Sequence, residues 1–231
     1  MNEPVYLQIS HPQGFVPIYI RWKYKWITGL ILCFFGMVIY LASNHFPLAS
    51  PYELPLSIID RKIPFIPASI WIYFSLFIFI PVVYSLNRCV ISLNIHLYSF
   101  IFTVFFSTCC FYLFPITYPR ELFPIPKTTS FWTQMLIQAV RNTDQPINCA
   151  PSLHVSLAYQ IALGFLKDQK RYFPLVFSWA TLLALSTLTT KQHYFLDVIL
   201  GGALAVATHW IFHHLLQYQY PAAACENSQI M

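Results

Sequence analysis

Residues 71–84, "WIYFSLFIFIPVVY", form an apolar stretch without a charged side chain. Polar and apolar residues do not alternate along it, so it lacks the two-residue period of a transmembrane β-strand. It lies in a charge-free run, 63–87, that is long enough for the roughly 20 residues of a transmembrane helix. Because backbone polar groups in hydrocarbon can bond only within the protein, this stretch predicts a membrane-spanning helix.

The whole chain shares this character. Of its 231 residues, 57% are hydrophobic and 9% are charged, against about 25% charged in an ordinary soluble domain. The charged residues leave six long charge-free runs, and the shortest is 172–190. These runs predict spans near 26–44, 67–86, 93–115, 151–166, 172–190 and 193–216. We therefore expect an all-α membrane protein, a six-transmembrane-helix bundle.

The expected organisation is one catalytic domain, 26–216, between an N-terminal segment, 1–25, and a tail, 217–231. Positive residues cluster beside the spans in "RWKYK" (21–25) and "KDQKR" (167–171). The positive-inside rule then predicts that both termini are cytoplasmic. The long loops 45–66 and 116–150 would lie on the outer (periplasmic or luminal) face. The second contains "TSFWTQMLIQAVR" (129–141), whose spacing predicts a helix lying flat in the membrane interface.

Two groups of polar residues stand at outer ends of predicted spans, where ionisable side chains are candidate functional residues. Arg120 ends "FPITYPRE" (114–121), and His154 belongs to "NCAPSLHVSLAY" (148–159). Pro151 suits the first position of a helix. The free N–H groups after it, beginning with that of Ser152, would attract an anion. Taken alone, Arg120 would ordinarily be interpreted as a residue that anchors a helix end at the membrane interface. His154 alone would ordinarily be interpreted as structural.

A third group is "TKQHYFLD" (190–197). His193 and Asp197 are four residues apart, which predicts one helix face. A carboxylate beside an imidazole fixes its tautomer and leaves the other ring nitrogen free to attack. Lys191 precedes them as a cation that could reach an anion. The ordinary alternative is an interfacial His, with an Asp that favours the helix dipole.

The alternation of the spans brings these groups to one face, at lipid headgroup depth. Two histidines, two cations and a helix N-terminus predict phosphoryl transfer, in which one His attacks phosphorus and the other protonates the leaving oxygen. His209 and His213 share a helix face, but His209, the nearer of the two, already lies about 24 Å from His193 along the helix. We expect these two, and His214, to be interfacial, and we predict neither a metal nor a cofactor.

The motifs resemble those of the type 2 phosphatidic acid phosphatase (PAP2) superfamily. "PSLH" (151–154) and "HYFLD" (193–197) match its second and third elements, with Ser186 at the family's serine position. The resemblance covers roughly residues 60–216 and is closest to the inositolphosphorylceramide synthase-like branch. It implies a six-helix bundle of the PAP2 type without metal or organic cofactor. It also implies His154 as general acid, His193 as nucleophile forming a phosphohistidine, and Asp197 as its orienting carboxylate.

The resemblance further implies that Arg120 binds phosphate. Leu113 and Thr187 stand where the family has basic residues, and Glu121 replaces the proline after the Arg. The residues that could replace the missing cations are Lys191, Lys127 and Arg141.

The leading hypothesis is a membrane phosphatase acting on a lipid phosphate, of the phosphatidic acid, phosphatidylglycerol phosphate or isoprenyl (di)phosphate type. One alternative is a transferase that passes a phosphoryl or phospho-headgroup to a lipid or inositol hydroxyl. Another is a non-enzymatic binder or transporter of anionic lipids, which would need Arg120 and Lys191 but not the His pair. The expected partners are the substrate and membrane lipids, with neither nucleic acid nor an obligate protein partner.

Overall fold

The computed structural model describes residues 24–87, 89–166 and 169–219. Most of the two predicted terminal segments, 1–25 and 217–231, lies outside the described residues. The helices are α1 (Lys25–His45), α2 (Ile58–Lys62), α3 (Ile70–Phe74), α4 (Leu76–Leu86), α5 (Val90–Leu113), α6 (Phe131–Thr143), α7 (Leu153–Gly164), α8 (Phe173–Thr189) and α9 (Phe195–Gln219). Short 3-10 turns occupy Pro67–Ser69, Arg120–Leu122 and Lys170–Tyr172, and the strands are β1 (Tyr52–Glu53) and β2 (Ile116–Thr117).

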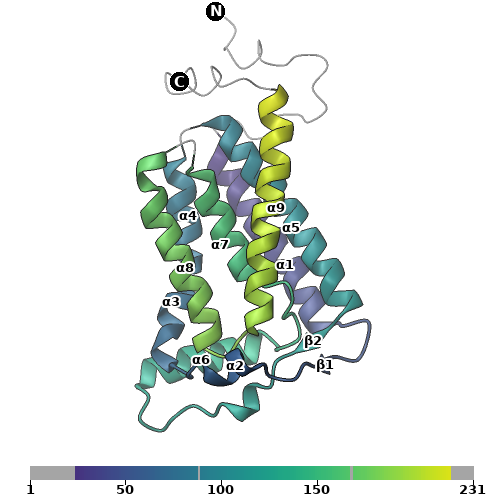
Figure 1. Cartoon of the computed structure of the whole chain (residues 1–231), viewed down its shortest axis with the longest axis vertical. Helices are drawn as coiled ribbons and strands as arrows, with labels where there is room; N and C mark the ends of the chain where they lie inside the picture. The colour runs from purple at the N-terminus through teal and green to yellow at the C-terminus, as the bar shows by residue number, and fades with distance from the viewer. Residues whose placement is uncertain (1–23, 88, 167–168, 220–231) are drawn as a thin grey trace, which may run out of the picture.

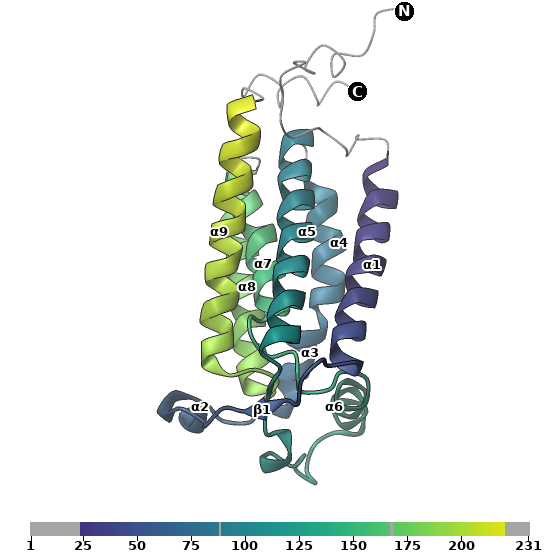
Figure 2. The same ribbon diagram turned by 90° about the vertical axis from the view of Figure 1, so that its right-hand side faces the viewer.

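The long helices α1, α4, α5, α7, α8 and α9 run side by side along one axis (Figure 1). α1 begins and α9 ends at the same end of this bundle (Figure 2). α7 is the central helix, because it packs against α4, α5, α8 and α9. Large apolar side chains such as Leu30, Phe105 and Trp210 remain exposed on the outer faces, as expected where lipid replaces water.

Five segments among the described residues are long and apolar enough to cross a membrane. They are Lys25–His45, Pro67–Leu86, Ile91–Leu113, Lys170–Thr189 and Phe195–Leu215. The predicted sixth span, 151–166, is not confirmed, because α7 has only 12 residues. At 1.5 Å per residue it is about 18 Å long, well short of a hydrocarbon core of about 30 Å.

α7 is short because the chain enters the bundle before it becomes helical. A Cβ on Gly201 of α9 would lie 2.7 Å from the carbonyl oxygen of Ser152, the residue before α7. Gly201 is six residues beyond the start of α9 at Phe195, so α7 begins about 9 Å inside the bundle. Non-helical backbone at this depth is tolerated where protein surrounds it, and residues 147–153 are all buried.

The predicted span 67–86 is present but is built from pieces. A 3-10 turn, α3 and α4 follow one another, and Ser75 separates the two helices. The Ser75 N–H lies 3.1 Å from the carbonyls of both Trp71 and Ile72. This junction directs α3 toward the end of the bundle where the candidate site lies.

A layer of irregular chain closes one end of the bundle; we call residues 46–66 and 115–150 the cap. It holds α2, α6 and a parallel pairing of β1 with β2, and these four strand residues leave the predicted all-α class unchanged. Figure 2 shows α6 nearly end-on, crossing the bundle axis. The helix expected within 129–141 is therefore present and transverse, with Phe131 and Trp132 exposed. Its insertion into the membrane interface stays a prediction.

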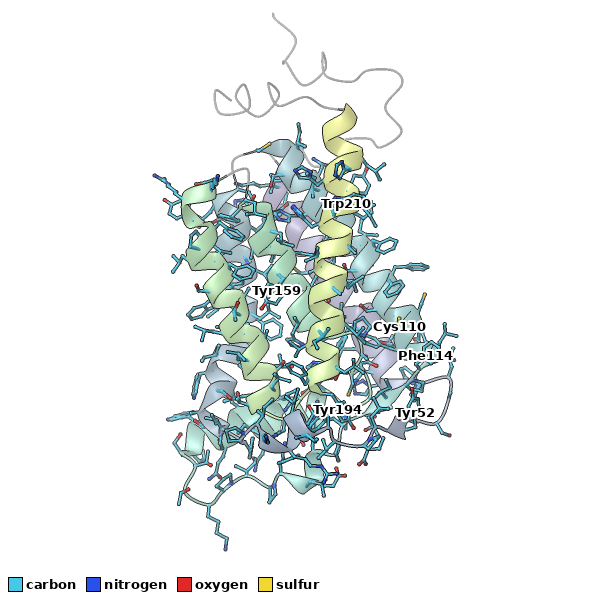
Figure 3. The ribbon with its side chains drawn as sticks, in the orientation of Figure 1. Tyr52, Cys110, Phe114, Tyr159, Tyr194 and Trp210 are labelled. Carbon is cyan, nitrogen blue, oxygen red and sulfur yellow. The ribbon has the colours of Figure 1, made fainter. Side chains whose placement is uncertain are left out.

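The cap is joined to the bundle through Tyr194, at the cap end of α9 (Figure 3). Its ring is buried with Ile116, Tyr118 and Cys149. Its hydroxyl lies 2.9 Å from the carbonyl oxygens of both Leu54 and Thr117, one beside each strand of the small sheet. The turn that carries His193 is thereby held by both cap loops.

Candidate active site

The structure brings the two predicted catalytic histidines together. His154 lies in the first turn of α7, and His193 lies in the turn between α8 and α9. Their ring centroids are 6.0 Å apart, with the ring planes inclined by 60°. Two imidazoles that are 39 positions apart in the chain thus lie close together at the cap end of the bundle.

The contacts of His193 determine which of its nitrogens carries the proton. Its Nδ1 lies 3.0 Å from the Cys149 carbonyl oxygen and 3.4 Å from Asp197 Oδ2. A carbonyl oxygen can only accept, so Nδ1 donates the hydrogen bond. In the neutral ring Nε2 then keeps its lone pair. The Cys149 carbonyl is a contact that side-chain motifs could not predict.

Asp197 is completely buried and has two neighbours in the turn. Besides its approach to His193, Oδ2 accepts the Tyr194 N–H at 2.8 Å. Tyr194 directly precedes α9, so this carboxylate also caps the helix from its third position. His193 therefore lies outside α9, which begins at Phe195, and the expectation that both residues share a helix face is wrong. The turn nevertheless brings the pair together.

His154 is positioned by an aromatic ring that sequence reasoning missed. Tyr73 of α3 stacks on its imidazole, with centroids 4.4 Å apart and planes inclined by 31°. Tyr73 is buried and His154 is partly exposed. Nothing in the apolar run 71–84 distinguishes Tyr73 from its neighbours, so this contact needed the fold.

The predicted anion-binding helix end is present but is shifted. Helix α7 begins at Leu153 with Ser152 as its N-cap residue, so the expectation that Pro151 starts the helix is wrong. Ser152 donates its N–H to the Asp197 carbonyl at 3.2 Å. Its Oγ has no hydrogen-bond partner within the described chain and is buried. The N–H groups of Leu153 and His154 have no acceptor one turn earlier, so this end still offers donors.

Arg120 is buried beside Asp144 rather than standing free. Its Nη1 donates to the Asp144 carbonyl at 2.5 Å, and Nη2 lies 3.7 Å from Oδ2 of the same residue. The carboxylate also accepts the Tyr40 hydroxyl at 2.6 Å. Arg120 Nε has no partner among the described residues. Burial and the neighbouring His193 and Arg120 all oppose protonation of His154, so Arg120 lies within electrostatic range of that imidazole.

Lys191 is engaged with the cap. It has a positive φ of 58°, and its Nζ donates to the carbonyls of Asp60 and Ile63 at 2.9 and 2.6 Å. The ammonium also lies 4.5 Å from the centroid of the Phe123 ring. Burial lowers the pKa of Lys191, while the nearby Asp60 carboxylate raises it. One ammonium hydrogen is left beyond the two carbonyls, and its use for phosphate stays a prediction.

Asp60 of α2 is a second residue that sequence reasoning missed. Its Oδ1 accepts the Phe195 N–H at 2.7 Å, so it holds the start of α9. Its Oδ2 accepts the N–H and hydroxyl of Ser57 in a capping box. The capping-box pattern Ser-x-x-Asp was a visible signal of a helix start, but its contact with a turn 135 positions later was not. Asp60 and Lys191 together clamp the turn that contains His193.

The other basic candidates lie in the cap. Arg141 of α6 donates from Nη2 to the Phe123 carbonyl at 2.9 Å. Burial lowers the pKa of Arg141, and the neighbouring Arg120 lowers it further. Lys127 and Glu121 are exposed. Of the basic candidates in the cap, Arg141 therefore has the environment most like that of Arg120. Neither Lys127 nor Glu121 contacts His154 or His193 within the described chain.

The histidines of α9 belong to the other end of the bundle. His209 and His213 have ring centroids 5.5 Å apart, and their neighbour Trp210 lies far from Tyr194 along the helix (Figure 3). Within residues 24–87, 89–166 and 169–219, no three His, Cys, Asp or Glu side chains are grouped to hold a metal ion.

The geometry suits transfer of an anionic group. An imidazole with a free Nε2 faces a second imidazole, and a buried Arg and a helix N-terminus lie beside them. A family model described as PAP2 superfamily matches residues 51–211. No curated protein and no solved structure matches the chain.

Proposed function

The chain belongs to the PAP2 superfamily, and from this premise we propose that it is a membrane phosphatase that hydrolyses a lipid phosphate through a phosphohistidine. Membership suggests a phosphatase or phosphotransferase type of activity. The five membrane-length helices suggest a multi-pass membrane protein. We propose three further points: that the substrate is a lipid phosphate, that the intermediate is a phosphohistidine, and that water is the acceptor.

One observation carries the proposal: the two imidazoles lie 6.0 Å apart and only one is anchored through Nδ1 by a carbonyl. That anchoring leaves Nε2 of His193 as the nucleophilic atom. His154, stacked on Tyr73, is held where it can serve the leaving group. The pair thus has the division of roles that covalent phosphoryl transfer requires.

In the first step, His193 Nε2 attacks phosphorus and the bond from phosphorus to the lipid oxygen breaks. His154, protonated once the negative charge of the bound phosphate offsets its burial beside Arg120, gives its proton to that oxygen, so the lipid leaves as an alcohol. Asp197 stabilises the positive charge that develops on the His193 ring. Arg120, the Ser152 hydroxyl and the first-turn N–H groups of α7 hold the phosphoryl oxygens.

In the second step, water attacks the phosphohistidine. Neutral His154 takes a proton from this water, the bond from nitrogen to phosphorus breaks, and inorganic phosphate leaves. Both histidines then return to their starting states. An alcohol in the place of water would give a new phosphate ester, so one set of residues serves hydrolysis or transfer.

The proposed substrate is a lipid because the site lies at the ends of membrane-length helices. We place the site on the outer face and the start of α1 on the cytoplasmic face, since basic clusters flank that end in the sequence. A phosphate at headgroup depth would reach the histidines while its chains stay in the bilayer. Phosphatidic acid, phosphatidylglycerol phosphate and isoprenyl (di)phosphates all meet this condition.

The test is a panel of these lipid phosphates, assayed with purified wild-type protein and with His193→Ala. The wild type should release phosphate from at least one of them. His193→Ala should lower kcat by at least about 10³-fold, because the nucleophile is lost. Full phosphate release by His193→Ala would disprove the assignment.

Further experiments with the same assay distinguish this phosphatase from the two alternatives, a transferase and a non-enzymatic lipid binder. Activity should persist with a chelator, since no step uses a metal. Labelled phosphate that appears in a new lipid when an alcohol or inositol is supplied would identify a transferase of the inositolphosphorylceramide synthase-like kind. Lipid binding without turnover in wild type, unchanged in His154→Ala, would instead support a binder or transporter.

A further inference from the structure

A cavity of about 310 Å³ lies between α1, α4, α5 and α7, apart from the candidate active site. Its walls include residues from Trp26 to Cys33 of α1 and from Phe77 to Tyr84 of α4. Each stretch advances about 10 Å along its helix, so the cavity is elongated along the bundle axis. Its volume is at the lower end of the range for small-molecule sites, about 300–1,000 Å³.

The cavity opens toward the bilayer. Trp26, Leu30 and Phe77 belong to its lining and are exposed by 47%, 70% and 49%. They lie on two of the membrane-length segments, so the surroundings of the opening are hydrocarbon. At the end nearest the start of α1, Trp26 meets the Tyr84 ring edge-on at 6.2 Å, and a Cβ on Gly29 would lie 3.2 Å from the same ring.

Two polar side chains in the wall carry a buried atom without a hydrogen bond in the described chain, His96 at Nδ1 and Tyr84 at its hydroxyl. His96 of α5 lines the cavity and is 8% exposed, and its Nδ1 has no hydrogen bond within the described chain. The other edge of the ring lies against Gly164, where a Cβ would be 2.0 Å from Nε2. The ring is therefore fixed by close packing. Buried polar groups in native proteins nearly always have a partner, so the Nδ1 of His96 calls for a ligand atom.

Gln160, another polar side chain in the wall, is already occupied. The Gln160 amide nitrogen contacts the hydroxyls of Thr103 and Thr208, the latter at 2.7 Å. His96 Nδ1 and the Tyr84 hydroxyl thus remain for an occupant, and His96 is the more deeply buried of the two. The occupant needs a long apolar body and one hydrogen-bonding atom.

We propose that this cavity binds one hydrocarbon chain of a membrane lipid, and that a hydroxyl or carbonyl oxygen of that lipid hydrogen-bonds His96. The chain enters between α1 and α4 from the bilayer, the only phase that the opening meets. It lies parallel to the helices and joins α1 to α4, α5 and α7. The site includes neither His154 nor His193, so lipid binding in this cavity can be tested independently of the proposed catalysis.

The experiment uses the full chain in detergent micelles and two photoreactive probes of equal length. One is a C16 alcohol with a diazirine in mid-chain, and the other is the corresponding hydrocarbon. Mass spectrometry maps the covalent adducts. Both probes should label Ile161, which lines the cavity. The alcohol should label it about fivefold more, as one net hydrogen bond allows.

Three variants give the proposal its controls. Cys33→Phe fills the cavity and should reduce labelling of Ile161 by both probes at least tenfold. Ile31→Phe adds the same ring on an exposed face of α1 outside the lining, and should change nothing. His96→Phe should remove the preference for the alcohol while hydrocarbon labelling persists.

The result that overturns the proposal is labelling spread evenly over lipid-facing positions such as Phe34 and unaffected by Cys33→Phe. Equal labelling by both probes in the wild type overturns the part played by His96. Retained elution as a single species from size-exclusion chromatography shows that each variant is folded. Leu157→Phe fills the cavity from α7 and replaces Cys33→Phe if that variant fails this check.

Discussion

At the scale of single residues, most polar side chains of the site hold one another before they meet a substrate. His193 uses Nδ1 for Cys149 and Asp197, Arg120 uses two of its nitrogens for Asp144, and Lys191 uses two ammonium hydrogens for the cap. What remains for a phosphate is His193 Nε2, Arg120 Nε, the Ser152 hydroxyl and the start of α7. Such preorganised donors are the usual source of transition-state stabilisation.

Lys191 makes two contacts with the cap that the sequence did not predict. As a clamp, it should matter for stability more than for phosphate affinity. We expect Lys191→Met to lower the free energy of unfolding by about 2–4 kcal/mol, because two charge-assisted hydrogen bonds are lost and two buried carbonyls are left. The inhibition constant of inorganic phosphate should stay within about twofold of the wild type.

Arg120→Gln is the matched control for Lys191→Met. It removes a charge that the proposal places on the phosphate, and should raise the inhibition constant at least about tenfold, the equivalent of about 1.4 kcal/mol. An equal rise in both variants would show that the third ammonium hydrogen of Lys191 binds phosphate.

At the scale of elements, the short helix α7 sets the depth of the site. Its N-cap residue, Ser152, lies beside Gly201 of α9, where backbone approaches backbone without room for a side chain. The Ser156 hydroxyl reinforces this contact by donating to the carbonyl of Ser152 at 2.9 Å or of Gly201 at 3.0 Å. The position of His154 relative to His193 therefore depends on how closely α7 and α9 pack.

Gly201→Ala should separate the two helices. The new Cβ would lie 2.7 Å from the Ser152 carbonyl oxygen and 3.1 Å from Val155 Cβ, and overpacking of this kind costs about 1–3 kcal/mol. We expect a fall of at least tenfold in kcat and a lower Tm, measured on purified protein with its best lipid phosphate.

The adjacent Gly202 provides a control in the same helix. A Cβ there meets nothing within 4 Å, so Gly202→Ala should keep full activity and a Tm equal to or above that of the wild type. If the two variants behave alike, the close approach of α7 to α9 is not what positions the histidines.

The same scale explains what the sequence could predict. Charge-free runs marked five membrane-length helices, and helical spacing marked the transverse helix α6. The predicted span 151–166 is too long at both ends, because loops buried in protein can be as apolar as helices, and α7 runs only from Leu153 to Gly164. Three contacts could not be predicted from any local pattern. Cys149 uses its backbone carbonyl, Tyr73 uses its ring, and Asp60 contacts a turn that is distant in the sequence.

At the scale of the whole molecule, the bundle has two unlike ends. The cap, with its sheet and α6, closes the end beside the candidate site, whereas α1 begins and α9 ends at the other (Figures 1 and 2). Five membrane-length helices and one short central helix connect them. The proposed orientation places the cap outside the cytoplasm.

Two exposed lysines at opposite ends test this orientation. Lys127 lies in the cap, and Lys170 lies just before α8 at the other end. In sealed right-side-out vesicles, a membrane-impermeant maleimide should modify Lys127→Cys directly. Lys170→Cys should react only after detergent is added, with the unsubstituted chain as the background. The reverse pattern would place the active site on the cytoplasmic face.

The central claim is that His193 carries the phosphoryl group during turnover. The direct measurement is rapid mixing of the purified protein with ³²P-labelled lipid phosphate, an alkaline quench that preserves phosphohistidine, and mapping of the label by peptide sequencing. We predict label on His193 in the wild type and none in His193→Ala. Label on another residue, or turnover by His193→Ala at the wild-type rate, would contradict the mechanism.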